Sequence, residues 1–201
     1  MEKKVNLGGF KCQALYHANK GVPIVLLHGY SFTTEVWRRM GILDLLAEKK
    51  LPFLALDMPY GMKTSCQPRT RNPEPNLAFL AEAIKNFFDS AVPILVGPSL
   101  GGHIALMYAS RFPVKGLMLI SPSRVLSDDL VESYDKFKFP VRIVWGTQDN
   151  IVSGEEMRVL SEKLPNAKLV TYEGAGHAAY TSQPDRFKRD LLELYAAAEQ
   201  T

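Results

Sequence analysis

The amino-acid sequence predicts an α/β fold with a mostly parallel central sheet of about eight strands and helices on both faces. Short apolar runs alternate with amphipathic helical patterns along most of the chain, which is typical of strands joined by crossover helices. The N-terminus differs, because two strand-like runs there flank a Gly-Gly pair and indicate an antiparallel hairpin. The 201 residues suit a single domain, residues 1–201, since single domains have roughly 100–250 residues.

The first elements follow in order from these patterns. The hairpin joins residues 5–7 to residues 10–17, and the next buried strand is expected at residues 23–27. Thr33 or Thr34 can cap the following helix, because a hydroxyl oxygen accepts from the free N–H groups at a helix start. This helix carries four apolar side chains on one face: Trp37, Met40, Leu43 and Leu46. A further strand is expected at residues 53–57.

Residues 58–75 are rich in Pro, Gly and cationic side chains and predict a long loop, a kind of segment that is often functional or mobile. The next helix has four apolar residues on its inner face: Leu77, Leu80, Ile84 and Phe87. The remaining strands are expected at residues 93–97, 116–120, 141–145 and 168–172. Further helices are expected at residues 100–111, 129–135 and 155–164. The closing helix is indicated by four residues at helical spacing: Phe187, Leu191, Leu194 and Tyr195.

Composition and charge exclude several classes of protein. Hydrophobic residues make up 46% and charged residues 22%, which is ordinary for a globular domain and unlike a disordered chain. The net charge is +3 and the cations are scattered, so no nucleic-acid partner is expected. No segment approaches the ~20 apolar residues of a membrane span, and no secretory signal is visible. Cys12 and Cys66 are therefore expected to stay reduced in a cytoplasmic protein.

The strongest chemical pattern is Gly97-Pro98-Ser99-Leu100-Gly101, which lies between a predicted strand and a predicted helix. A G-x-S-x-G sequence in this place forms a tight turn that raises the serine hydroxyl above the sheet. The following helix offers the Leu100 N–H and its positive dipole end to a developing oxyanion. A chance match in such a chain has a probability of roughly 5–10%. Its position between strand and helix therefore favours Ser99 as a nucleophile.

A serine hydroxyl needs a base that accepts its proton, and the chain has four histidines. His177 directly follows the last predicted strand, in a glycine-containing segment that lets the imidazole reach the carboxyl edge of the sheet. His177 is the predicted base, and the alternative is an exposed loop histidine. The others are expected to be structural or to lack a catalytic context: His17, His28 and His103.

The base in turn needs a carboxylate that fixes its tautomer. Asp149 follows the strand that ends at residue 145 and gives the order Ser, Asp, His along the chain. Asp149 is the predicted acid, and the alternative is a turn or helix-cap residue. Three competing acids also follow strands: Asp57, Asp128 and Asp129. Among these, Asp57 is expected to hold its own loop.

The second oxyanion donor is expected from the loop after the first long parallel strand. Gly29 allows the backbone to turn inward there, so the Tyr30 N–H is the predicted donor, with Ser31 as the alternative. Three residues are expected to line the substrate pocket: Ser31, Phe32 and Pro98.

No cofactor is expected. The cysteines and histidines show no zinc spacing. The serine turn lacks the Gly-Lys-Ser/Thr of a phosphate loop, and no G-x-G-x-x-G follows the first strand.

Four segments together resemble the α/β-hydrolase superfamily: His28-Gly29, Gly97-Pro98-Ser99-Leu100-Gly101, Gly146-Thr147-Gln148-Asp149 and Gly174-Ala175-Gly176-His177. The resemblance covers nearly the whole chain and implies an α/β-hydrolase fold. It implies Ser99 as nucleophile, His177 as base and Asp149 as acid. It also implies that Tyr30 and Leu100 donate to the oxyanion.

Two departures from the superfamily pattern matter. Many members carry a cap of dozens of residues where residues 121–140 leave room for about one short helix, so no substantial cap is expected. The family loop D-x-P-G-x-G-x-S is altered here at residues 57–65, so its shape cannot be carried over.

Residues 28–37 and 98–100 are similar to a small capless branch, the abhydrolase-domain-containing-fourteen type, also described as a transcription-factor-interacting hydrolase. That resemblance implies acyl-ester hydrolysis, or removal of acetyl groups from lysine with coenzyme A as acceptor.

We therefore expect a serine hydrolase of carboxylesterase type that cleaves small-molecule acyl esters through an acyl-enzyme. A thiol or amine acceptor would make the same site an acyltransferase or a deacylase. The missing cap favours short acyl chains, because little apolar wall remains to bury a long one. Two alternatives stay open, namely a non-catalytic interaction module on a hydrolase fold and carbon–carbon bond hydrolysis. No particular protein partner can be read from the residues.

Overall fold

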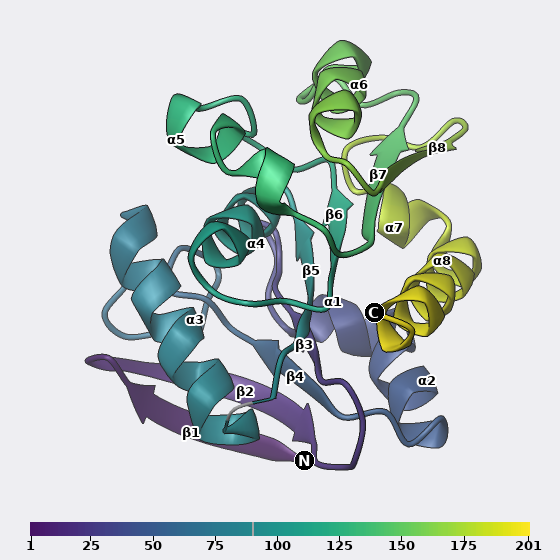
Figure 1. The fold of residues 1–201 in the computed structure, drawn as a ribbon. Coiled ribbons are helices and arrows are strands. Elements are labelled where there is room, and N and C mark those ends of the chain that lie inside the picture. Colours follow the sequence, from purple (N-terminus) through teal and green to yellow (C-terminus); the bar gives the residue numbers. More distant parts are fainter. Residues whose placement is uncertain (90) are drawn as a thin grey trace.

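The computed structural model describes residues 1–89 and 91–201. Eight strands form one sheet in the order β1-β2-β4-β3-β5-β6-β7-β8 (Figure 1). Their bounds are β1 (Glu2–Leu7), β2 (Phe10–His17), β3 (Ile24–Leu26), β4 (Phe53–Leu56), β5 (Ile94–Pro98), β6 (Gly116–Ile120), β7 (Val141–Gly146) and β8 (Ala167–Tyr172). Strands β3 to β8 are parallel, whereas β1 and β2 form the predicted antiparallel hairpin, which joins β4. The predicted fold class is confirmed.

Helices cover both faces of the sheet (Figure 1). One face packs against α3 (Pro73–Phe88), α4 (Leu100–Arg111) and α6 (Gly154–Lys163), and the other against α1 (Glu35–Arg39), α2 (Ile42–Glu48), α7 (Ala179–Ser182) and α8 (Pro184–Glu199). Each helix turns its apolar stripe to the sheet, so the strands are buried on both sides and two hydrophobic cores result. Trp37 is fully buried in the second core.

The parallel arrangement of the strands determines where the predicted functional residues lie. Since β3, β5, β7 and β8 run in the same direction, the segments that follow them meet at one edge of the sheet. Ligands of open α/β sheets bind at this carboxyl edge. The predicted functional residues Tyr30, Ser99, Asp149 and His177 all follow these strands.

Several local predictions were wrong in detail. The single helix expected after Thr34 is divided into α1 and α2, because Gly41 between them adopts a left-handed conformation with φ 67°. The long loop ends at Asn72, because Pro73 already begins α3. The short helix expected near residue 130 is two pieces, α5 (Asp128–Val131) and a 3₁₀ turn (Tyr134–Lys136). In the described residues 121–140, between β6 and β7, these two short pieces are the only helices, so no substantial cap lies there, as predicted.

The expectation of two free thiols is contradicted, because Cys12 and Cys66 form a disulfide. Their pairing results from a bridge between the neighbouring residues Lys11 and Gln67, which lays the loop along β2. Both cysteines are buried. Sequence patterning misses this pair because the two residues are 54 positions apart and belong to different elements.

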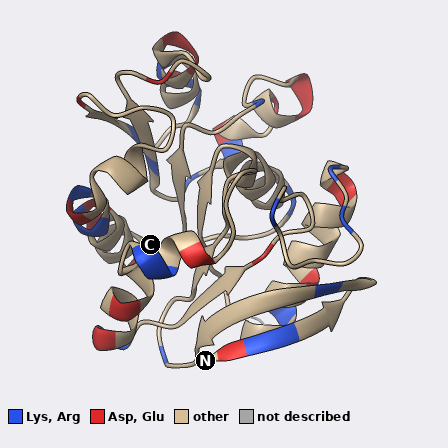
Figure 2. Cartoon of the chain, turned by 180° about the vertical axis from the view of Figure 1, so that it is seen from behind, with Lys and Arg blue, Asp and Glu red and all other residues tan. Residues whose placement is uncertain are grey.

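Charged residues occur on the hairpin, the helices and the loops, as the ribbon colours of Figure 2 show in the view from behind. Within residues 1–89 and 91–201, none of the helices combines the length and the apolar character required to cross a membrane.

Candidate active site

The turn between β5 and α4 has a strained backbone, and the close packing of the strand against the helix keeps it in this conformation. Ser99 adopts φ 51° and ψ −117°, an unfavourable region for a residue with a side chain. A Cβ at Gly97 would lie 2.5 Å from the carbonyl carbon of Gly101, so the strand and the helix approach too closely there for any side chain. This is the sharp strand-to-helix turn that the G-x-S-x-G pattern predicts. It leaves Ser99 half-buried at the start of α4.

The imidazole of His177 faces Asp149. Nδ1 of His177 lies 2.9 Å from Oδ2 of Asp149, and the Asp149 side chain is 0% exposed whereas that of His177 is 22% exposed. Because a carboxylate only accepts hydrogen bonds, Nδ1 is the protonated nitrogen in the neutral ring. The other nitrogen, Nε2, is then free to accept a proton.

Asp149 is held in its ionised form. Burial acts to raise the pKa of Asp149, but hydrogen bonds outweigh it, and the pKa lies below its ordinary value. The backbone N–H groups of Ile151 and Val152 donate to Oδ1 at 2.8 and 3.0 Å, and His177 donates to Oδ2. A negative carboxylate therefore stabilises any positive charge that develops on the imidazole.

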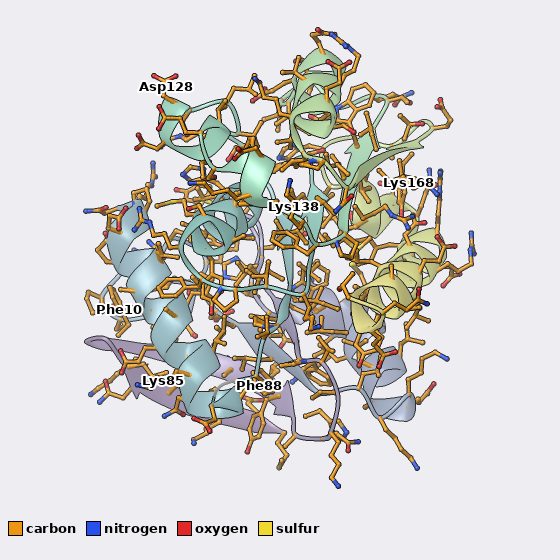
Figure 3. All side chains as sticks on the ribbon, viewed as in Figure 1. Phe10, Lys85, Phe88, Asp128, Lys138 and Lys168 are labelled. Carbon is orange, nitrogen blue, oxygen red and sulfur yellow. A yellow bond between two sulfur atoms is a disulfide. The ribbon has the colours of Figure 1, made fainter. Side chains whose placement is uncertain are left out.

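The structure places the competing acids elsewhere. Asp57 accepts from the backbone N–H groups of Thr34 and Ser65 at 2.8 and 3.0 Å, so it holds the loop after β4. Asp128 and Asp129 lie exposed on α5, and Asp128 points away from the molecule in Figure 3. Among the four acids considered, Asp149 is thus the one bonded to His177.

The remaining histidines have other surroundings. His28 is fully buried, accepts from the Met58 N–H at Nε2 (2.9 Å) and lies 2.8 Å from the Gly29 carbonyl oxygen at Nδ1. Nδ1 therefore carries the proton, and burial lowers the pKa of this histidine. His17 stacks on Phe53 in the hairpin, and His103 is buried on α4.

The loop after β3 turns its backbone toward the serine. In the part of the chain that the structure describes, the N–H groups of Tyr30, Ser31 and Leu100 have no protein acceptor. The Gly29 carbonyl is directed to the His28 ring and also accepts from Phe32 N–H at 3.0 Å. Since a trans peptide sets C=O and N–H on opposite sides, the Tyr30 N–H points away from that ring.

One cavity of about 190 Å³ brings Ser99, His177 and the loop after β3 together, whereas Asp149 and Leu100 are not part of its lining. It is lined by Gly29, Tyr30, Ser31, Phe32, Pro98, Ser99, Ile151, His177, Ala178 and Tyr180. The cavity therefore includes the three residues expected for the substrate pocket. Sequence analysis did not identify Ile151 or Tyr180, because neither belongs to a recognisable motif. Tyr180 enters through α7, a helix of four residues that is too short to show a periodic pattern.

Within residues 1–89 and 91–201, no three His, Cys, Asp or Glu side chains are grouped so that they could hold a metal ion.

Comparison with known proteins identifies the family to which the chain is similar. Residues 22–138 match the family model described as alpha/beta hydrolase fold, and residues 125–195 match one described as TAP-like protein. The chain is 34% identical over 173 residues to human "Protein ABHD14A", covering 85% of this chain and 63% of that protein. It is 32% identical over 177 residues to "Putative protein-lysine deacylase ABHD14B" of Rattus norvegicus, covering 85% of this chain and 81% of that protein.

Solved structures show the same fold. A hydrolase described as CIB-like from Thermoplasma acidophilum superimposes with a TM-score of 0.85 at 21% identity, covering 96% of both chains. An esterase from Exiguobacterium antarcticum superimposes with a TM-score of 0.83 at 16% identity, covering 98% of this chain and all of its own. Together with the arrangement of β3 to β8 and of the helices around them, these matches show that the chain belongs to the α/β hydrolase family, with relatives of the ABHD14 type.

Proposed function

We propose that this protein is a serine hydrolase of carboxylesterase type that acts on small, short-chain acyl esters. The observation that carries the proposal is the His177–Asp149 hydrogen bond of 2.9 Å at the cavity that also contains Ser99. In this proposal Ser99 is the nucleophile, His177 the general base and Asp149 the group that orients it. The Tyr30 and Leu100 N–H groups donate to the oxyanion.

Acylation follows from this geometry. The Ser99 Oγ attacks the acyl carbonyl carbon while Nε2 of His177 takes the hydroxyl proton. The carbonyl oxygen becomes negative and accepts from the Tyr30 and Leu100 N–H groups. The bond to the leaving oxygen then breaks, that oxygen takes the proton from His177, and an acyl ester on Ser99 remains.

Deacylation repeats the steps with water. A water molecule transfers a proton to His177 Nε2 as its oxygen attacks the acyl carbon. The bond to Ser99 breaks, the serine oxygen recovers the proton, and the free acid leaves. No cofactor takes part in this scheme.

The small cavity supports a preference for short acyl chains. Its volume of about 190 Å³ is below the ~300–1,000 Å³ typical of pockets for drug-sized ligands. Only α5 and a 3₁₀ turn occupy the position of a cap. A cavity of this size leaves little room to bury a long chain.

A second candidate, deacylation of lysine, is favoured by the printed name of the rat relative ABHD14B. The same residues would attack an amide carbonyl, and a thiol such as coenzyme A would replace water as acceptor. The chain spans 63% of human ABHD14A, so activity and partners of the whole relative are carried over only as a proposal.

We further infer that residues 1–201 form one domain, which the single sheet from β1 to β8 supports. A cytoplasmic location stays a prediction, and the Cys12–Cys66 disulfide weighs against it because reducing compartments disfavour such bonds.

Labelling with a fluorophosphonate probe tests the proposal. We expect wild-type protein to be labelled, Ser99→Ala to be unlabelled, and Ser123→Ala to be labelled like wild type as a serine control near the site. A folded wild type that is not labelled would leave an interaction module as the better account. Hydrolysis of p-nitrophenyl acetate and octanoate tests the chain preference, and faster octanoate hydrolysis would contradict it. Ring-fission diketones, offered beside these esters, test carbon–carbon bond hydrolysis.

A further inference from the structure

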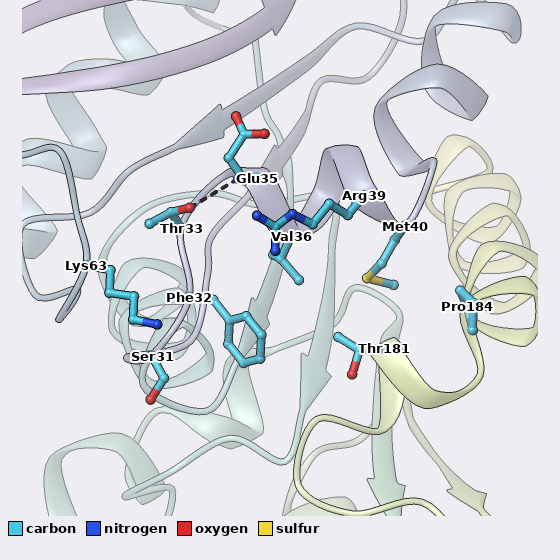
Figure 4. A pocket seen from close by; sticks show the side chains of 10 residues that line it. All are labelled: Ser31, Phe32, Thr33, Glu35, Val36, Arg39, Met40, Lys63, Thr181 and Pro184. Atoms are coloured by element: carbon cyan, nitrogen blue, oxygen red, sulfur yellow. Dashed lines mark hydrogen bonds between the residues drawn. The ribbon is translucent and has the colours of Figure 1, made fainter.

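A second, larger cavity shares two wall residues with the cavity that contains Ser99, and Figure 4 shows the side chains that line this second cavity. Its volume is about 490 Å³, and Ser31 and Phe32 form part of the wall of both cavities. The remaining lining comes from α1 and the residues beside it, the loop after β4, α7 and the start of α8: Thr33, Glu35, Val36, Arg39, Met40, Lys63, Thr181 and Pro184. Ser31 and Phe32 therefore separate two adjacent cavities.

Two cationic side chains border the larger cavity. Lys63 reaches in from the loop after β4 and Arg39 from α1, and Figure 4 shows both extending toward its middle from opposite sides. Within residues 1–89 and 91–201 neither forms an ion pair. The one carboxylate in the lining, Glu35, is bound by Arg38 at 3.0 Å, and Arg38 itself does not line the cavity.

The surrounding loop adds to this positive charge. Residues 58–73 contain three cations and no Asp or Glu. Arg71 donates to the Tyr30 hydroxyl and lies over its ring, and Arg69 donates to the Met62 carbonyl oxygen, so the loop holds both in a separate hollow next to Tyr30. A negatively charged ligand would be attracted to these cations, most strongly at low ionic strength.

The location indicates which end of the ester lies there. In the proposed reaction His177 gives its proton to the leaving oxygen, so the leaving group lies on the His177 side of Ser99. Helix α7 begins two residues after His177, and its Thr181 lines the larger cavity. A leaving group that extends from His177 along α7 would therefore enter the larger cavity.

We propose that the cavity bounded by Lys63 and Arg39 is a subsite for a leaving group that carries an anionic substituent, a carboxylate or a phosphate. The inference rests on the proposed hydrolase function and specifies its substrate class. Lys63 and Arg39 would bind the anion, with Thr33 and Thr181 as neutral polar neighbours.

A matched pair of esters tests this subsite. 4-Acetoxyphenylacetate carries a carboxylate, and 4-acetoxyphenylacetamide replaces it by a neutral amide of similar size. The methylene group separates the substituent from the ring, so the two phenols leave with similar ease. We expect kcat/KM of the wild type to be about 3–10-fold higher for the anionic ester. A phenyl phosphate analogue separates phosphate from carboxylate recognition.

Charge-neutral variants locate the effect. Lys63→Gln and Arg39→Gln should each reduce the preference toward unity while kcat/KM for the amide stays near wild type. Lys49→Gln, at the exposed end of α2, removes the same charge outside the cavity and should retain the preference. Equal rates for both esters in the wild type, or a preference that survives in both cavity variants, would overturn the subsite and leave the hydrolase proposal intact. Failure to hydrolyse either ester together with no Ser99 labelling would instead refute the hydrolase proposal.

Discussion

His177 Nδ1 lies 2.9 Å from Oδ2 of Asp149, although the two residues are 28 positions apart and follow different strands. The carboxylate is also held by two backbone N–H groups, so its position does not depend on the histidine. The imidazole is thereby fixed in one tautomer before any substrate binds. This preorganisation is the feature on which the proposed chemistry depends.

Asp149→Asn should lower kcat for p-nitrophenyl acetate by about 10³–10⁴-fold. The amide N–H₂ can donate to Nδ1, which would move the imidazole proton to Nε2 and remove the base. Steady-state kinetics and the rate of fluorophosphonate labelling measure the loss. Asp129→Asn on α5 is the control and should remain within twofold of wild type. Full activity of Asp149→Asn would show that another group orients His177.

Gly97→Ala should destabilise the fold by more than about 3 kcal/mol. Its Cβ would lie 2.5 Å from backbone atoms of Gly101, which cannot move without displacing α4. Gly176→Ala is the matched control, because the nearest atom to its Cβ is 4.0 Å away. Urea unfolding followed by circular dichroism compares the two variants. Similar stabilities would mean that the turn relaxes easily.

His28 should make the protein less stable in acid. Burial lowers the pKa of His28 in the folded chain below the ordinary 6.5, so below that pH the unfolded chain binds a proton that the folded chain does not. The contribution of His28 to the free energy of unfolding is therefore fully present above pH 6.5. It is lost as the pH decreases from 6.5 to the pKa of His28 in the folded chain, by at most about 1.4 kcal/mol per pH unit. His103, whose pKa burial also lowers, acts in the same direction.

The variant His28→Asn isolates this contribution. Its free energy of unfolding, measured in urea at pH values of about 5.5 and 7.5, should change less between the two pH values than that of wild type. The comparison uses the difference between pH values, so a lower overall stability of the variant does not affect it. An unchanged difference would exclude His28 as an acid-sensitive group.

The disulfide should contribute up to about 4 kcal/mol, because it closes a loop of 54 residues in the unfolded chain. Reductant is expected to lower the urea midpoint of wild type and to leave the double variant Cys12→Ala, Cys66→Ala unchanged. Thiol titration of unfolded, unreduced protein should detect no free thiol. Detection of two free thiols would contradict the disulfide and show that both cysteines are reduced, as the sequence alone predicts.

The sequence by itself determined most of the strands and helices and the strand-to-helix turn at Ser99. Apolar runs between helical patterns located the strands from β2 onward within one residue, since burial on both faces requires such runs, whereas β1 begins three residues before its predicted start. The spacing of Gly97, Ser99 and Gly101 predicted the strand-to-helix turn, because steric limits on backbone approach act over only a few residues. The order Ser, Asp, His then selected Asp149 among four acids.

Only the tertiary structure determined the contacts between segments that are far apart in the chain. The Cys12–Cys66 bond, the boundary that Tyr180 gives the Ser99 cavity, and the approach of Lys63 and Arg39 each join elements far apart in the chain. Local propensity contains no information about these contacts, because they arise only when helices and loops pack on the finished sheet. For the same reason the sequence located the proposed nucleophile, whereas only the packed molecule shows the charged cavity beside it.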